Sequence, residues 1–412
     1  MRTRALVLSW LAYASYYLGR KGFSVVKAAL TQGAGVSAGR LALIDTAFLG
    51  AYALGQVPSG LLADRWGARR LVGLGLLGSA LACAAFGSVS SATLFAVCFA
   101  CNGLAQSTGW PGTTKAVAEH TTAAERGRVM GWWSTCYQVG GIAATALAAY
   151  VLGRYGWRAV FQLPAAWLGC VGLAVLVWLP AGLKEGASAR MGGATDVEAG
   201  AAPIDVAAER SVALLRLLRN PRVLSYGACY FCLKLIRYSL LFWLPYYLHT
   251  AVGFGQVQSG YLSTSFEVGG VVGTIGLGTL SDRSARSRSG MAMLSIGALA
   301  FALLLYAQLP LGSALLHFVL MALIGALLFG PDALLSGAAA QDAGGTHAAA
   351  TAVGIVNGMG SVGALLQGAV TLGVQQALGW NALFYVFFGL AVLACACLVP
   401  ALRAERASIG TA

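Results

Sequence analysis

Charged residues are scarce in this sequence. Asp, Glu, Lys and Arg together make up 10% of the 412 residues, whereas hydrophobic residues make up 58%. Soluble domains carry roughly 25% charged residues, so a soluble globular protein is excluded. The chain is long enough for about twelve membrane spans of roughly 20 residues each. We therefore expect an all-α polytopic membrane protein.

Motifs of catalytic or metal chemistry are also missing. The four histidines are isolated, and the sequence has no nucleophile elbow, zinc-binding helix or Walker loop. The nine cysteines lie mostly inside apolar runs, where a free cysteine packs as a small hydrophobic residue. We expect no enzyme activity, no cofactor and no bound metal.

Long apolar segments are what the sequence has in abundance. Twelve of them predict membrane helices at 6–30, 41–62, 71–88, 92–118, 129–152, 157–180, 223–249, 258–280, 290–308, 311–337, 350–376 and 380–402. A long polar stretch at 181–221, rich in Ala, Gly and charge, is typical of a linker. The predicted organisation is a six-helix bundle over 1–180, a linker over 181–221 and a second six-helix bundle over 222–412.

The basic residues are distributed unevenly between the predicted loops. If both termini and the linker share one side, 18 Lys and Arg fall there and three fall on the other side. By the positive-inside rule, the termini and linker are cytoplasmic. The formal net charge of +13 therefore reflects membrane topology, and no nucleic-acid partner is expected.

The two halves of the sequence repeat one another. The loop residues Asp64 and Arg65 in Gly60-Leu-Leu-Ala-Asp-Arg recur 218 residues later as Asp282 and Arg283 in Gly278-Thr-Leu-Ser-Asp-Arg. Two arginines inside predicted spans, Arg20 and Arg237, are 217 residues apart. A duplicated six-helix unit explains both offsets and predicts that the two arginines face each other across a pseudo-twofold axis.

The first predicted helix carries an unusual polar stripe. Tyr13, Tyr17, Arg20, Ser24 and Lys27 follow the three-and-four spacing of one helical face, with Arg20 near mid-membrane. Positive charge combined with phenol donors indicates an anion-binding face. Lys27, nearer the end of the segment, has an alternative interpretation as a residue that extends to the membrane surface.

The buried charges do not balance in the predicted helices. Lys234 and Arg237 share a face of the seventh helix. Three acids, Asp45, Glu267 and Asp332, oppose six basic residues, which leaves an excess of about three positive charges. Static salt bridges are the alternative, and they cannot neutralise every cation. We expect Asp45 near the outer surface and Glu267 beside Lys234 or Arg237 in the empty state. The basic residues are Arg20, Lys21, Lys27, Lys115, Lys234 and Arg237.

Other residues carry two interpretations each. Gln106 either contacts substrate hydroxyls or joins helices, and the same choice applies to Tyr137. The charges of Asp64, Arg65, Asp282 and Arg283 either gate the carrier or anchor its loops. Three glycine patterns predict close helix packing, and the first of them resembles a dinucleotide fingerprint only in its spacing. They are Gly73-Leu-Gly-Leu-Leu-Gly78, Gly269-Gly-Val-Val-Gly273 and Gly354-Ile-Val-Asn-Gly358.

With these motifs, the sequence resembles the major facilitator superfamily, and within it the organophosphate:phosphate antiporters. The resemblance rests on Tyr16-Tyr-Leu-Gly-Arg-Lys-Gly-Phe23, Gly109-Trp-Pro111, Glu125-Arg-Gly127, Val139-Gly-Gly141 and Lys234-Leu-Ile-Arg-Tyr-Ser-Leu-Leu-Phe-Trp243. It implies that Arg20 and Arg237 bind a phosphoryl group, and that Tyr13, Tyr17, Lys21 and Gln106 also belong to the site. The chain departs from the bacterial glycerol-phosphate exchanger at Gln56, where that protein has lysine, and at Tyr137, where it has histidine.

The resulting hypothesis is an alternating-access antiporter in the cell membrane, in a bacterium the inner membrane, acting as a monomer. It would exchange a sugar phosphate, such as glucose 6-phosphate, or glycerol 3-phosphate for inorganic phosphate. Its predicted substrate-binding residues are Arg20, Arg237, Tyr13, Tyr17, Lys21, Lys234, Gln106 and Tyr137, and its gating residues are Asp64, Arg65, Asp282, Arg283 and Glu267. The alternatives are a sugar-phosphate sensor of the same family and a proton-coupled transporter of another organic anion.

Overall fold

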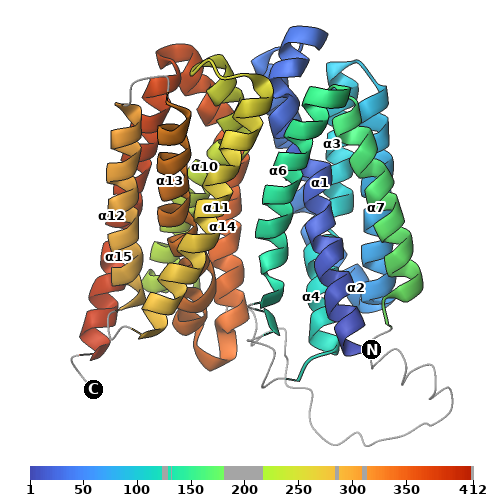
Figure 1. The fold of residues 1–412 in the computed structure, drawn as a ribbon. Coiled ribbons are helices and arrows are strands. Elements are labelled where there is room, and N and C mark those ends of the chain that lie inside the picture. The colour runs from blue at the N-terminus through green and yellow to red at the C-terminus, as the bar shows by residue number, and fades with distance from the viewer. Residues whose placement is uncertain (123–128, 131, 181–216, 284–286, 309–312, 410–412) are drawn as a thin grey trace, which may run out of the picture. The chain divides into compact units, whose positions relative to one another are not determined.

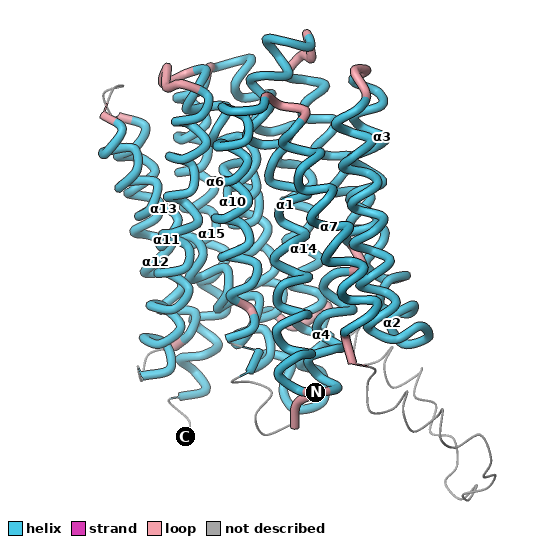
Figure 2. The backbone as a smooth tube through the Cα atoms, turned by 45° about the vertical axis from the view of Figure 1, so that its right-hand side comes forward, coloured by secondary structure: helices cyan, strands magenta, loops and turns pink. Residues whose placement is uncertain are grey.

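The computed structural model describes residues 1–122, 129–130, 132–180, 217–283, 287–308 and 313–409. All regular secondary structure in this part of the chain is helical, as the apolar segments predict (Figures 1 and 2). Eight of its helical stretches are long and apolar enough to cross a membrane. The predicted linker lies outside the described residues, except for its last five positions.

The helices form two compact units. The first comprises Met1–Thr195 together with Phe242–Thr264, and the second comprises Asp196–Leu241 together with Ser265–Ala412. The predicted division placed Phe242–Thr264 with the second half of the sequence. In the structure this stretch packs with the N-terminal helices, because Val257 lies beside Gly153 and Gly260 lies beside Ala149.

The first unit contains α1, α6 and α7 side by side (Figure 1), and α2 packs closely against α3 and α7. The segments predicted as 41–62 and 71–88 join without a loop, since Gly67 alone leaves the helical conformation, at φ 75° and ψ 162°. Only glycine adopts such a conformation without strain. The helices are α1 (Arg2–Ala34), α2 (Ala38–Ser88), α3 (Ala92–Gln106), α4 (Gly109–Glu119), α6 (Thr135–Tyr155) and α7 (Ala159–Trp178).

The segment predicted as 92–118 is interrupted after Gln106. The chain makes a turn at Ser107 and Thr108 before α4 begins. Pro111 sits in the first turn of α4, where the missing N–H of a proline costs nothing, because that donor would have no intrahelical partner. The turn ends α3 with the Gln106 side chain inside the unit.

Two helices, α10 (Pro221–Thr250) and α11 (Gln256–Arg283), are divided between the units. The second unit contains α10 up to Leu241 and α11 from Ser265. It also contains α12 (Arg288–Ala307), α13 (Ala314–Leu334), the π-helical turn η1 (Leu335–Ala339), α14 (Ala340–Leu378) and α15 (Trp380–Ile409). The sequence predicted a break between 337 and 350, but α14 already begins at Ala340. Seven alanines from Ala338 to Ala350 favour helix strongly enough to outweigh the two glycines in this stretch.

Glycines bring helix backbones into contact in both units. A Cβ atom on Gly269 or Gly273 of α11 would overlap the backbone of Ala322 or Ala326 in α13. Gly325 of α13 meets the carbonyl of Phe266 in the same way. These contacts confirm the packing face predicted for 269–273 and hold α11 and α13 at backbone distance.

The other two glycine patterns have different outcomes. Gly73, Gly75 and Gly78 all lie against side chains of neighbouring helices, so their dinucleotide-like spacing reflects packing, as predicted. The prediction for 354–358 is wrong, because no described atom lies within 4 Å of a Cβ placed on Gly354 or Gly358. The close contacts of α14 are instead at Gly360 and Gly363, which meet Tyr230 and the backbone of Phe231.

We expect Gly273→Ala to destabilise the protein by about 1–3 kcal/mol, because the added methyl group overlaps a backbone carbonyl that cannot move aside cheaply. The measurement is the melting temperature of the purified protein in detergent. Gly276→Ala on the same helix is the control, since no described atom lies within 4 Å of its added Cβ. Equal melting temperatures for the two variants would contradict this account of the α11–α13 contact.

Candidate functional site

Arg20 occupies the middle of α1 and is half-buried. Its Nε donates a hydrogen bond of 2.9 Å to Oε1 of Gln106 at the end of α3. Its guanidinium carbon lies 4.3 Å from the ring centroid of Tyr17, one turn earlier on α1, and 5.6 Å from that of Tyr52 on α2. An amide and two aromatic faces therefore orient this cation within the first unit.

A buried polar network fixes the Gln106 amide. Its Nε2 donates to Oδ1 of Asn102 at 3.1 Å and to Oγ of Ser79 at 3.4 Å. Asn102 in turn donates 2.8 Å to the carbonyl of Gly19, beside Arg20. Because the amide nitrogen is engaged in this way, its oxygen faces the guanidinium. Gln106 thus joins helices and also positions Arg20, while Asn102 and Ser79 are supporting residues that the sequence analysis missed.

The predicted tyrosines pack among aromatic and apolar side chains, and they are buried or half-buried. Tyr13 is buried, with its ring centroid 5.4 Å from Trp110, 5.8 Å from Trp133 and 6.1 Å from Tyr17. Tyr137 is half-buried and packs against the apolar cluster that contains Tyr13. These residues form an aromatic cluster beside α1. Their contact with a substrate stays a prediction.

Lys21 and Lys27 are both buried, and for Lys27 this corrects an expectation. Lys27 does not extend to a surface, because its side chain is fully buried and forms an ion pair with Asp45, which is also fully buried. The Lys27 Nζ lies 3.7 Å from the ring centroid of Trp243. Asp45 is likewise fully buried inside the unit, and its expected position near the outer side of the membrane stays a prediction. The polar stripe of α1 therefore ends, as a candidate anion site, before Lys27.

Arg237 on α10 is held differently in the second unit. Its Nη1 donates 2.6 Å to Oδ2 of Asp332 on α13, and its guanidinium carbon lies 4.1 Å from the ring centroid of Phe329. One turn earlier, Lys234 Nζ lies 5.1 Å from the ring centroid of Tyr230 and 5.2 Å from that of Tyr238. Each unit thus presents a guanidinium above an aromatic ring, but Arg20 bonds an amide and Arg237 bonds a carboxylate.

The charge count of the sequence analysis changes by one. The expected segment ended at residue 118, whereas α4 includes Glu119, which pairs with Lys115 at 3.6 Å. Adding Glu119 to the three acids and six cations of the predicted intramembrane set gives four acids against six cations, so the formal excess of that set falls from about three to two. A membrane protein still has to compensate that excess, and an anionic ligand is one way to do so.

The predicted gating residues are only partly visible. The prediction that these charges lie in loops is wrong, because Asp64 and Arg65 are inside α2, and Asp282 and Arg283 are the last residues of α11. The side chains of Asp64, Asp282 and Arg283 lie outside the described part of the structure, so their ion pairs stay predictions. Arg65 is exposed, whereas Glu267 on α11 is buried. The acid that pairs with Arg237 is Asp332, a partner that the sequence analysis did not assign to it.

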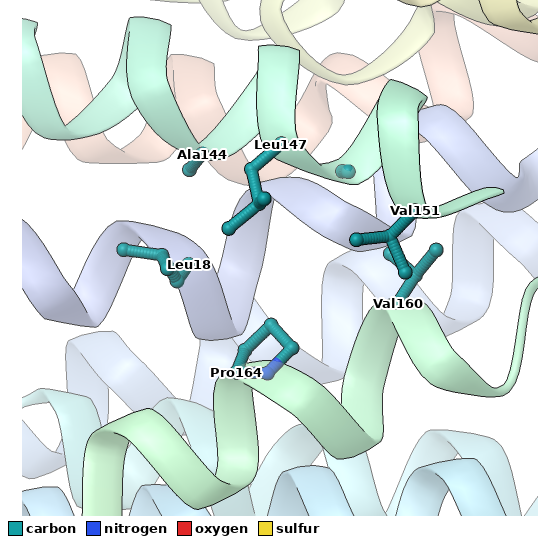
Figure 3. Close-up of a pocket in the computed structure, with 7 residues that line it drawn as sticks. Leu18, Ala144, Leu147, Val151, Val160 and Pro164 are labelled. Carbon is teal, nitrogen blue, oxygen red and sulfur yellow. The ribbon is translucent and has the colours of Figure 1, made fainter. Parts of the chain in front are cut away.

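A small pocket between α1, α6 and α7 is unsuited to an anion. It is lined by apolar side chains alone, among them Leu18, Leu147, Val151, Val160 and Pro164 (Figure 3). No lining side chain can donate a hydrogen bond. This pocket is therefore not the candidate site.

Comparisons with known proteins identify the family and the fold. The profile of the Major Facilitator Superfamily matches residues 9–368. Sugar phosphate exchanger 3 of Xenopus laevis is 30% identical over 89% of this chain and 79% of that protein. Glucose-6-phosphate exchanger SLC37A2 of Mus musculus is 28% identical over 95% of this chain and 90% of that protein. A crystal structure of a bacterial homologue of the human lysosomal transporter Spinster shares the fold, with 16% identity, a TM-score of 0.77 and coverage of 98% and 97%.

The Lys27–Asp45 pair predicts a distinct pattern of stability. Lys27→Met should destabilise the protein by about 3–5 kcal/mol, because it leaves the buried Asp45 carboxylate without a counter-charge. The double variant Lys27→Met/Asp45→Leu should recover most of that loss, since neither charge remains. Melting temperatures in detergent test the pattern, and a double variant no more stable than the single one would refute it.

Substitutions at Gln106 test its role in positioning Arg20. Gln106→Leu removes a hydrogen bond to a charged group, worth about 1.5–3 kcal/mol, and should weaken binding of inorganic phosphate about tenfold or more. Gln106→Glu should weaken it further, because a carboxylate on the guanidinium competes with the anion. Affinity is measured from the phosphate-dependent melting temperature of the purified protein.

The control for these variants is Thr114→Val, whose hydroxyl bonds only carbonyls of its own helix and which should bind phosphate like the wild type. Tight phosphate binding by Gln106→Glu would show that Gln106 does not act through Arg20.

Proposed function

The chain belongs to the major facilitator superfamily and to its organophosphate:phosphate antiporter family, and on that basis we propose that it exchanges a phosphorylated metabolite for inorganic phosphate. The metabolite is a sugar phosphate or glycerol phosphate, and the protein works by alternating access in the cell membrane. The relatives are named as exchangers of sugar phosphates, which supports this substrate class.

The observation that carries the proposal is the pair Arg20 and Arg237. Each is a guanidinium in the central part of a helix, each is oriented by a hydrogen bond from one nitrogen, and each lies over an aromatic ring. Guanidinium donors match the oxygens of a phosphoryl group and stay charged at any physiological pH. We infer that the two arginines bind the phosphoryl group together, one from each half of the chain.

Neighbouring residues have subsidiary roles in this proposal. Lys21 and Lys234 add positive charge beside the two arginines. Lys21 follows Arg20 directly, and Lys234 lies one turn before Arg237. Tyr13, Tyr17 and Tyr137 offer phenol groups to the hydroxyls of the metabolite. The charges of Asp64, Arg65, Asp282 and Arg283, with Glu267, open and close the cytoplasmic side.

Exchange follows from the charge of the site. A loaded carrier has its excess positive charge compensated by the phosphoryl dianion, whereas an empty carrier does not. Reorientation is therefore easier with a ligand bound, which favours one-for-one exchange over net movement. The distribution of 18 Lys and Arg against three supports cytoplasmic termini.

We expect Arg20→Ala and Arg237→Ala each to abolish exchange almost completely, because either change removes one of two guanidiniums that bind the phosphoryl group. The measurement is uptake of labelled glucose 6-phosphate into proteoliposomes loaded with phosphate. Arg40→Ala and Arg403→Ala are matched controls, since both arginines are exposed, one in each unit. Transport unchanged in either of the first two variants would remove the two-arginine mechanism.

The exchange itself is tested with the wild-type protein. Uptake into liposomes loaded with phosphate should exceed uptake into liposomes without it at least tenfold. Equal uptake in the two preparations would contradict an antiport mechanism while leaving the substrate class open.

A further inference from the structure

Only one of the two carboxylate oxygens of Asp332 accepts a hydrogen bond from a described residue. Its Oδ2 accepts the hydrogen bond from Arg237, whereas its Oδ1 is buried and accepts no hydrogen bond from any described residue. The side chain is only 7% exposed. A buried carboxylate normally satisfies both oxygens, so the partial satisfaction of Asp332 calls for an explanation.

The backbone around Asp332 departs from a regular helix. Pro331 precedes it and lacks an N–H, and the π-helical turn η1 starts three residues later at Leu335. The Ser336 hydroxyl donates 2.7 Å to the carbonyl of Asp332. Irregular turns of this type inside membrane helices recur at functional sites.

The charged neighbours of Asp332 come from the helices packed against α13. On α10 they are Arg237, Lys234 and the phenols Tyr230 and Tyr238, and Asp332 interacts electrostatically with Lys234 and Tyr230. On α11, the buried Glu267 follows Phe266, whose ring centroid lies 5.2 Å from that of Phe329. His317, at the other end of α13, forms a hydrogen bond with Tyr306. The residues contributed by η1 and the neighbouring part of α14 are neutral, namely Ser336 and Asn357.

We propose that Asp332 is an internal counter-anion that holds Arg237 in the unloaded carrier and takes up a proton when the phosphoryl group replaces it there. The inference rests on the proposed function, because it assumes that Arg237 binds a phosphoryl group. Asp332 is a positioning residue in this scheme, since it acts through Arg237 and does not itself bind the substrate.

The physical reason is competition for one cation. A phosphoryl dianion and the Asp332 carboxylate both require Arg237, and the dianion brings more charge and more acceptor oxygens. Once displaced, an ionised carboxylate in these buried surroundings loses its hydrogen-bonded counter-charge and keeps only the more distant Lys234, which is costly. Uptake of a proton from water converts it to a neutral carboxylic acid and removes that cost. Each bound substrate is then accompanied by one proton on Asp332.

Linkage makes the effect measurable. If binding takes up one proton, the dissociation constant rises up to tenfold for each unit of pH increase, over the range in which Asp332 is ionised in the unloaded carrier. The substrate titrates as well, with a phosphate-ester second pKa near 6. Above about pH 8 the ester is fully dianionic, so any proton taken up there goes to the complex and not to the free ester.

The experiment measures the dissociation constant of glucose 6-phosphate by calorimetry between pH 6 and 9, for the full-length wild type and Asp332→Asn. Asparagine keeps the shape of the side chain and cannot titrate. We expect Asp332→Asn to bind more tightly than the wild type at pH 8.5, by tenfold or more, with a pH slope shallower by up to one decade per unit. Asp342→Asn is the control, because Asp342 is 62% exposed and pairs with Arg288.

A second readout does not depend on the folding of Asp332→Asn. In weakly buffered solution at pH 8.5, binding of glucose 6-phosphate should take up close to one proton per ligand, and Asp332→Glu should retain this uptake. No uptake by the wild type would overturn the proposal even if Asp332→Asn failed to fold. Identical pH slopes for the wild type and Asp332→Asn would overturn it too and would leave Asp332 as a static salt-bridge partner.

Failure of the proposed function looks different. In that case neither glucose 6-phosphate nor inorganic phosphate would bind the wild type at any pH. Binding with no proton uptake would remove only the role of Asp332.

Discussion

Positive charge buried in membrane helices is the constraint on which this structure depends. A cation in a low-dielectric interior needs a counter-charge, a strong hydrogen-bond partner or an aromatic face. The described residues use all three: Asp45 neutralises Lys27, Gln106 and Tyr17 orient Arg20, and Asp332 and Phe329 hold Arg237. The positions of the polar residues in α2, α3 and α13 follow from these requirements.

The same constraint separates structural cations from candidate ligand-binding ones. Lys27 is enclosed with its acid and the Trp243 ring, so its charge is already used inside the first unit. Arg20 and Arg237 are oriented without being enclosed to the same degree, since Arg20 is half-buried and Arg237 is 15% exposed. A ligand could not approach Lys27 without breaking a buried ion pair, whereas both arginines keep part of their surface exposed.

Much of the fold could be predicted from the sequence, because apolar length alone identifies membrane helices. Each predicted segment is mostly helical where the structure describes it, although a turn at Ser107 and Thr108 interrupts the segment 92–118. The pairing of charges could not be predicted, because it depends on which helices are neighbours. Asp332 is 95 residues from Arg237 along the chain, and no local pattern joins them. Glu119 was missed for a simpler reason, since α4 continues one residue beyond the expected end of its apolar segment.

The glycine contact between α11 and α13 limits how Asp332 can respond to a ligand. With Gly269, Gly273 and Gly325 pressed against opposing backbone, α13 has no room to slide or rotate against α11. A carboxylate that leaves Arg237 must therefore do so by a change of side-chain rotamer, on a helix that stays in place. The response at this position is then local, with a reach no greater than the length of one aspartate side chain.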